Sequence, residues 1–159
     1  MEKFRRFLSD SRFLAACKII LGFLFVAAAA GKIIDPHTFA ADVYSYMILP
    51  SALVPFFAAT VPWIELAAGL LLILDIKAQS SALIINTMLI MFIAAILIAL
   101  AQGVDIECGC FDLLFPEEKI GAVTIIRDLA MLVPGVIIMF FDKNDIGLYG
   151  LGKKKQEQQ

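Results

Sequence analysis

The sequence predicts an all-α membrane protein: a bundle of four transmembrane helices, with one short interfacial helix between the first and second spans. Of its 159 residues, 61% are hydrophobic and only 18% are charged, and the mean hydropathy is +0.89. A soluble domain of this size cannot bury so much apolar surface. The apolar residues fall into four runs, and about 20 residues at ~1.5 Å each cross a ~30 Å hydrocarbon layer. We therefore expect one membrane domain over residues 13–141.

The two ends of the chain are polar, and the overall charge is nearly balanced. A basic segment, 1–12, precedes the membrane domain, and a polar tail, 142–159, follows it. The formal net charge is −2, and no basic stripe with interleaved aromatic residues occurs, which argues against a nucleic-acid partner. No small-residue cleavage site follows a short apolar core, so we expect the first span to remain as an anchor.

The first span is predicted over residues 13–30. Its only charged residue is Lys18, whose side chain can snorkel to the nearby interface. The second half is nearly all small residues, and Ala27 with Gly31 forms a small-xxx-small pair. Such pairs allow the backbone of another helix to approach closely.

Residues 32–50 are too polar to span a membrane, and they predict a short amphipathic helix in the outer interface, covering the mouth of the bundle. Asp35 followed by Pro36 is an N-cap and first-turn signal. Four larger side chains then recur at helical spacing: Phe39, Val43, Tyr46 and Met47. His37, the single histidine, falls in the first turn. A solvated histidine is the preferred interpretation over a proton carrier, because no second metal ligand has the usual spacing.

The second span is predicted over residues 51–74, with Pro62 as a kink and Trp63 beside it. Glu65 is an ionisable residue inside this span, which is costly and suggests a function. Proton handling and a structural hydrogen bond to another span remain equally open. The depth of Glu65 depends on whether the helix begins near Ser51 or opens anew at Pro62.

The third span is predicted over residues 82–101, after a polar turn at 75–80, with Ser80 or Ser81 as its cap. Asn86 is its only strongly polar side chain, and such residues more often hold helices together than perform chemistry.

The fourth span is predicted over residues 120–141, with Pro134 as a kink. Arg127 and Asp128 lie two turns inside it. Adjacent helical positions point about 100° apart, so we expect each side chain to find a partner elsewhere in the bundle. Arg127 can lower the pKa of a thiolate, meet Glu65 or hold an anionic or quinone-like ligand, and a structural ion pair is an equal alternative.

The loop over residues 102–119 contains the sequence Cys108-Gly109-Cys110. A disulfide between residues this close forms a small strained ring that is easily reduced, and glycine between the cysteines removes the side chain that would oppose closure. The pair is therefore interpreted as redox-active. Two unreactive thiols at a helix end are the alternative, but neighbouring acids in a loop favour access over burial.

The distribution of positive charge predicts the orientation. The loops on the side opposite the termini contain only Lys32 and Lys119, whereas the remaining positions lie with the termini: Lys3, Arg5, Arg6, Arg12, Lys77, Lys143 and Lys153 to Lys155. By the positive-inside rule both termini face the cytoplasm, and the cysteine pair faces the oxidising periplasm of a bacterial inner membrane. Cys17, near the cytoplasmic end, is too distant to pair and is expected to be inert.

Eight short motifs along residues 17–141 together resemble those of the MauE branch of the DoxX-like membrane proteins. They are Leu21-Gly22, Gly31-Lys32, Asp35-Pro36, Leu49-Pro50, Pro62-Trp63-Ile64-Glu65-Leu66, Gly69-Leu70-Leu71-Leu72, Cys108-Gly109-Cys110-Phe111 and Arg127-Asp128-Leu129. The resemblance implies a four-helix bundle and, for some members, work beside periplasmic thioredoxin-like proteins or with quinones. The bundle is also similar, by analogy of architecture only, to quinone-linked proteins of the DsbB and vitamin K epoxide reductase type, although this chain lacks their Cys-x-x-Cys and second thiol pair.

Three functions remain open. The first is a thiol-disulfide oxidoreductase: Cys108 and Cys110 exchange electrons between a periplasmic thioredoxin-fold partner and a membrane quinone, in either direction. In this hypothesis Arg127 stabilises thiolate or ligand charge, and Glu65 or Asp128 carries protons. Lys32 is a further supporting residue, and Trp63 with Arg127 contacts the cofactor. The second is soft-metal binding or transport, because two close thiolates suit Cu(I) or Hg(II). The third is a non-catalytic assembly subunit.

Overall fold

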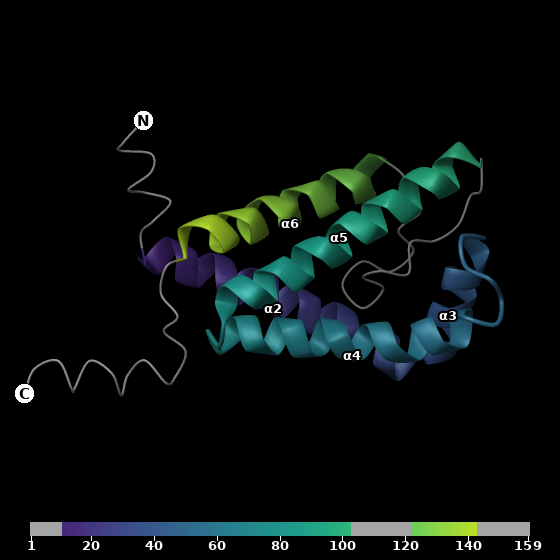
Figure 1. Ribbon diagram of the computed structural model, residues 1–159, viewed down its shortest axis with the longest axis horizontal. Helices are drawn as coiled ribbons and strands as arrows, with labels where there is room; N and C mark the ends of the chain where they lie inside the picture. Colours follow the sequence, from purple (N-terminus) through teal and green to yellow (C-terminus); the bar gives the residue numbers. More distant parts are fainter. Residues whose placement is uncertain (1–10, 103–121, 143–159) are drawn as a thin grey trace, which may run out of the picture.

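The computed structural model describes residues 11–102 and 122–142, and within them the chain forms helices joined by turns, with no strand (Figure 1). The helices are α2 (Ser11–Ile34), α3 (Pro36–Ser45), α4 (Val54–Ile73), α5 (Ala78–Ala101) and α6 (Ala122–Phe141). Four of them are long and apolar enough to cross a membrane: Arg12–Ile34, Val54–Ile73, Ala78–Ala101 and Val123–Phe141. The predicted all-α class and the four spans are confirmed.

The end of the first long helix and the start of the third differ from the prediction. The first helix continues through Lys32 to Ile34, so the expectation that Lys32 lies beyond the first span was wrong. The lysine is accommodated there because it is buried against a counter-charge described below. The third span begins at Ala78, preceded by Lys77 in a left-handed conformation with φ of 48°. Ser81, an expected cap, instead lies buried inside this helix.

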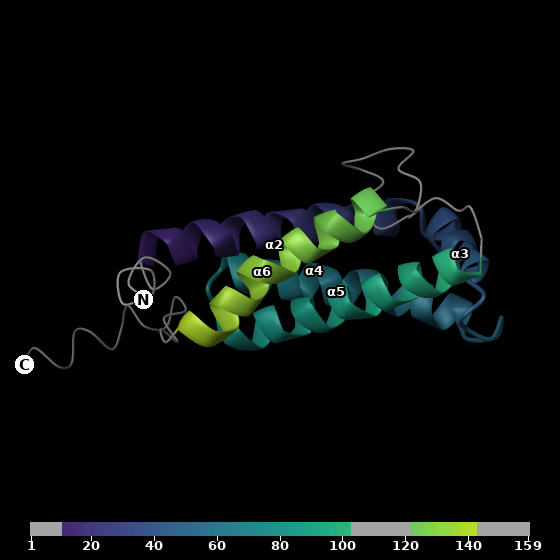
Figure 2. The same cartoon turned by 90° about the horizontal axis from the view of Figure 1, so that it is seen from above.

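The α2–α4 and α5–α6 pairs are the most extensively packed, and both views show the four long helices running alongside one another (Figure 2). Helices α2 and α4 approach each other closely at Gly22 and Gly69. A Cβ added to Gly22 would lie 2.8 Å from the carbonyl oxygen of Gly69, and one added to Gly69 would lie 2.9 Å from that of Gly22. Glycine is required at both positions, whereas the sequence pattern suggested Ala27 and Gly31.

Pro62 lies within α4, and the helix runs without interruption from Val54 to Ile73. Of the two alternatives that the sequence left open, the continuous helix is therefore correct. Glu65 lies in the interior of this helix rather than near its start, with only 1% of its surface exposed.

Helix α3 covers one end of the bundle, which we call the α3 end (Figures 1 and 2). Asp35 caps it: one carboxylate oxygen accepts the backbone N–H of Thr38 at 3.1 Å, and the other accepts the Thr38 hydroxyl at 2.8 Å. These bonds stabilise the ionised form and hold the pKa of Asp35 below its usual value. The opposite face of α3 buries Phe39 and Val43 against the bundle.

The opposite end of the bundle is held together by Lys18. Its Nζ lies 2.5 Å from the carboxylates of both Asp75, in the α4–α5 turn, and Asp142, after α6. Lys18 is 7% exposed, and its side chain is paired with carboxylates at this end of the bundle. One side chain thus links three segments that are distant in sequence.

Candidate functional site

The cysteine pair lies in the connection between α5 and α6. Cys108 and Cys110, with the rest of the predicted loop, lie outside the described residues. The described chain stops at Gln102 after α5 and resumes with α6, and both of these helix ends lie toward the α3 end (Figure 1). The described residues that flank this segment in the sequence, at the end of α5 and the start of α6, therefore lie toward the α3 end.

Lys32 of α2 and Glu65 of α4 form a buried ion pair. The Nζ of Lys32 donates to both carboxylate oxygens of Glu65, at 2.6 and 2.8 Å. The two residues are 4% and 1% exposed. Removing ionised groups from water costs on the order of several kcal/mol for each ion. Because of this cost, ionisable residues inside membrane spans are rare and usually mark functional sites. Both residues were predicted as site residues, but their pairing was not.

Two aromatic rings contact the ammonium group of this pair. The Nζ of Lys32 lies 5.1 Å from the ring centroid of Phe39, on α3, and 4.8 Å from that of Phe92, on α5. Both distances are within the ~6 Å range of a cation–π interaction. Since the rings surround the ammonium, the positive end of the ion pair faces α3 and α5.

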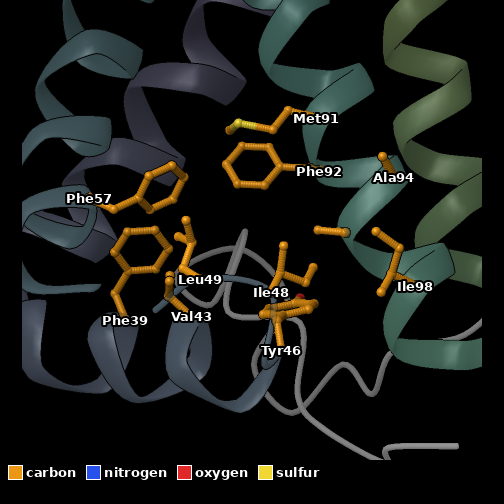
Figure 3. Close-up of a pocket in the computed structure, with 11 residues that line it drawn as sticks. Phe39, Val43, Tyr46, Ile48, Leu49, Phe57, Met91, Phe92, Ala94 and Ile98 are labelled. Carbon is orange, nitrogen blue, oxygen red and sulfur yellow. The ribbon is translucent and has the colours of Figure 1, made fainter. Parts of the chain in front are cut away.

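The same two rings line a cavity of about 320 Å³ between α3, α4 and α5 (Figure 3). Its wall is apolar and rich in aromatic side chains, and the residues are Phe39, Val43, Tyr46, Ile48, Leu49, Phe57, Met91, Phe92, Ala94, Ala95 and Ile98. In Figure 3 the rings of Phe39 and Phe57 lie on one side and that of Phe92 opposite. A volume near 300 Å³ is at the lower end of the range for small-molecule sites.

Arg127 and Asp128 pair with each other. The Nη2 and Nε of Arg127 lie 3.1 and 3.2 Å from one Asp128 oxygen, so the expectation that these neighbours would not pair was wrong. The directions of their Cβ atoms differ as expected, but the long arginine side chain bends back to its neighbour. Asp128 is 1% exposed, and Arg127 retains some exposure. Glu65 therefore pairs with Lys32 rather than with Arg127.

The other predicted site residues are dispersed. Trp63 is 60% exposed on the outer surface of α4, in a hollow with Ala59, Ala67 and Ile84. Arg127 borders a separate groove between α2 and α6 that also contains Cys17. Neither Trp63 nor Arg127 lines the aromatic cavity.

His37 is exposed in the first turn of α3, in agreement with a solvated histidine. Among residues 11–102 and 122–142, no group of three or more His, Cys, Asp or Glu side chains is arranged to hold a metal ion. Cys17 is a free, partly buried thiol.

Phe92 is the functional candidate that the sequence analysis missed. It occurs within a continuous apolar run on α5, where nothing in the sequence distinguishes one large side chain from another. Glu65 did leave a signal, because an ionisable residue inside a predicted span needs a partner, whereas Lys32 was predicted to lie just beyond the first span.

The sequence was compared with known proteins. The family model described as "Methylamine utilisation protein MauE" matches residues 10–141. The methylamine utilization protein MauE of Methylophilus methylotrophus is 28% identical over 114 residues, which cover 71% of this chain and 60% of that protein. That of Paracoccus denitrificans is 33% identical over 106 residues, covering 66% and 57%.

A third relative, from Methylorubrum extorquens, is 32% identical over 89 residues, which cover 55% of this chain and 48% of that protein. The matched regions thus span about half to three fifths of the length of these curated relatives. No solved structure matches significantly.

Proposed function

Because this chain belongs to the MauE family, we propose that it is a membrane thiol-disulfide oxidoreductase in which Cys108 and Cys110 exchange electrons between a thioredoxin-fold partner and a membrane quinone. The relatives are named methylamine utilization proteins, and we assign this activity to the same process. The chain would lie in a bacterial inner membrane, with both termini in the cytoplasm and the cysteine pair in the periplasm.

The buried Lys32–Glu65 pair carries the proposal. It lies within the membrane-spanning helices, and its ammonium group contacts α3 and α5 at the end from which the cysteine segment departs. A buried ionisable pair beside a redox site provides both a proton carrier and a counter-charge, which thiol and quinone chemistry require.

In the oxidising direction, a thiolate of the partner attacks one sulfur of the Cys108–Cys110 disulfide and releases the other as a thiol. The second partner thiol resolves the mixed disulfide, leaving an oxidised partner and a reduced Cys108–Cys110 dithiol. Re-forming the internal disulfide then gives up two electrons and two protons. A bound quinone supplies the acceptor by becoming a hydroquinone. Electrons flow in reverse if the partner is to be reduced.

The described residues suit such a co-substrate. An apolar, aromatic cavity suits an uncharged ring. The nearby Glu65 can take or give a proton through its contact with Lys32. Arg127, which pairs with Asp128, would stabilise thiolate charge.

The test uses the full-length chain in nanodiscs with a reduced thioredoxin-fold protein and a short-chain quinone. We expect quinone absorbance to fall with one hydroquinone formed for each disulfide made, and we expect Cys108→Ser and Cys110→Ser each to abolish this turnover. One of these variants should accumulate a mixed disulfide with the partner. The matched control is Cys17→Ser. This variant lacks the one cysteine that takes no part in the proposed reaction, so it should turn over normally.

Two results would contradict the proposal. If the reduced protein retains Cu(I) or Hg(II) in a stoichiometric amount without any quinone turnover, the cysteines serve a metal carrier. If neither cysteine variant traps a partner and turnover is absent, the chain acts as an assembly subunit.

A further inference from the structure

We propose that the cavity between α3, α4 and α5 is a binding site for a flat, lipid-soluble ring compound. The identity of that compound rests on the proposed function, under which it is the ring of the quinone. The ring site itself is inferred from the side chains that form the cavity.

The aromatic side chains that line the cavity favour a planar ligand. Four aromatic side chains from three elements line it: Phe39, Tyr46, Phe57 and Phe92. Aromatic rings gain most from offset or edge-to-face contact with other rings, which a flat ligand provides on several sides at once. The remaining lining residues are aliphatic or methionine, so the wall favours an uncharged ring.

One side of the cavity reaches the outer surface of the bundle. Met91, Ala94 and Ile98 line it along one strip of α5, and all three are exposed. In a bilayer, this strip faces lipid. A cavity of about 320 Å³ accommodates a ring but not a long isoprenoid chain, so the tail of the ligand would leave along this strip into the membrane.

The positive end of the Lys32–Glu65 ion pair lies behind the cavity. Lys32 does not line the cavity. Its ammonium group lies against the rings of Phe39 and Phe92, and both rings do line it. In a region of low dielectric, the ammonium end of this pair favours electron density on a ligand on the other side of the rings, and the Glu65 carboxylate on its far side offsets part of this effect.

Two other hollows are less suited to a ring. The hollow beside Trp63 has this residue as its only aromatic side chain, and the groove between α2 and α6 that contains Arg127 has none. Among the hollows formed by the described residues, the cavity in Figure 3 thus combines several rings with a buried cation.

The experiment is photolabelling of the full-length chain in nanodiscs with an azido-substituted short-chain quinone, followed by peptide mass spectrometry. We expect labels on α3 and on the α5 residues between Met91 and Ile98. Ala95→Trp, which places an indole in the cavity, should reduce this labelling about tenfold or more, equivalent to ~1.4 kcal/mol of binding. Ala94→Trp, at the exposed rim, is a second variant that perturbs folding less.

The matched control is Ala67→Trp, which makes the same substitution in the exposed hollow beside Trp63. It should leave the labelling of α3 and α5 unchanged. Loss of label in Ala67→Trp, with full labelling in both cavity variants, would overturn the proposal. So would labels confined to α2 and α6.

The result also separates this site from the proposed function. Labelling is repeated on a chain that carries both Cys108→Ser and Cys110→Ser, in which no thiol chemistry is possible. If the cavity is labelled there but the unmodified protein oxidises no thiols, the ring site stands and the oxidoreductase proposal fails. If turnover continues unchanged in Ala95→Trp and Ala94→Trp, the oxidoreductase stands and the ring site is elsewhere.

Discussion

Lys32 and Glu65, 33 positions apart in the sequence, meet inside the bundle with Nζ–O distances of 2.6 and 2.8 Å. The contact joins α2 to α4 and balances two charges that neither helix could bury alone. Its energetic and functional contributions can be separated by substitution.

Removing one partner should be far more damaging than removing both. Lys32→Met or Glu65→Leu leaves a lone buried charge, so we expect each to destabilise the protein by about 3–5 kcal/mol. The double variant removes both charges and should recover most of this loss. Thermal unfolding in detergent measures the stability, and quinone turnover measures the function.

The double variant should be stable but slow in turnover, because the proton carrier is gone. If it turned over at the normal rate, the ion pair would be structural only. If it were as unstable as the single variants, the cost would come from packing rather than from charge.

Lys18 holds together the end of the bundle opposite α3. Because its Nζ contacts both Asp75 and Asp142, Lys18→Met should lower the free energy of unfolding by about 2 kcal/mol. Lys77→Met removes an exposed lysine from the same end and should change stability little. Equal effects of the two variants in thermal unfolding would show that Lys18 contributes only its net charge.

The contact between α2 and α4 at Gly22 and Gly69 should not tolerate a methyl group. In Gly22→Ala, the new Cβ would lie 2.6 Å from Cγ1 of Ile73 and 2.8 Å from the carbonyl oxygen of Gly69. We expect a loss of about 1–3 kcal/mol from overpacking. Ala67→Leu, on the exposed surface of α4, is the control that adds volume without a clash, and denaturant unfolding compares the two.

Asn86 is buried in α5 without a hydrogen-bond partner for its amide among the residues that the structure describes, and it packs on Gly135 of α6. The expected role in holding helices together is therefore met by packing. Gly135→Ala should destabilise the protein, since its Cβ would collide with the Asn86 side chain. Adding Asn86→Ala should reverse most of the loss, and additive effects in this cycle would exclude direct contact.

The N-cap of α3 should depend on pH. The pKa of Asp35 is lowered in the folded protein, so its carboxylate contributes stability above the unfolded pKa and loses it as pH falls through the folded value. The protection of the first-turn amides from hydrogen exchange, relative to the intrinsic rate at each pH, should fall in acid. Asp35→Asn retains a capping oxygen that does not titrate, so exchange in this variant should lack the extra acid dependence.

Much of the fold follows from local patterns in the sequence. Apolar runs of sufficient length predicted the four spans, and Asp35-Pro36 predicted the start of α3, because length, hydropathy and capping are properties of consecutive residues. Glu65 was identified as a site residue for the same reason, since a charge stands out in an apolar segment.

The contacts between helices required the tertiary structure. Which residue pairs with Lys32, where α2 and α4 touch, and which rings enclose the cavity all depend on the rotation and vertical offset of one helix against another. In an almost wholly apolar run, such as that around Phe92, every face looks alike, so composition cannot decide which side chains turn inward. The sequence by itself therefore determined a four-span helical protein with a few charged residues in its spans. Only the packing of the helices paired Lys32 with Glu65 and placed this pair beside a ring-lined cavity.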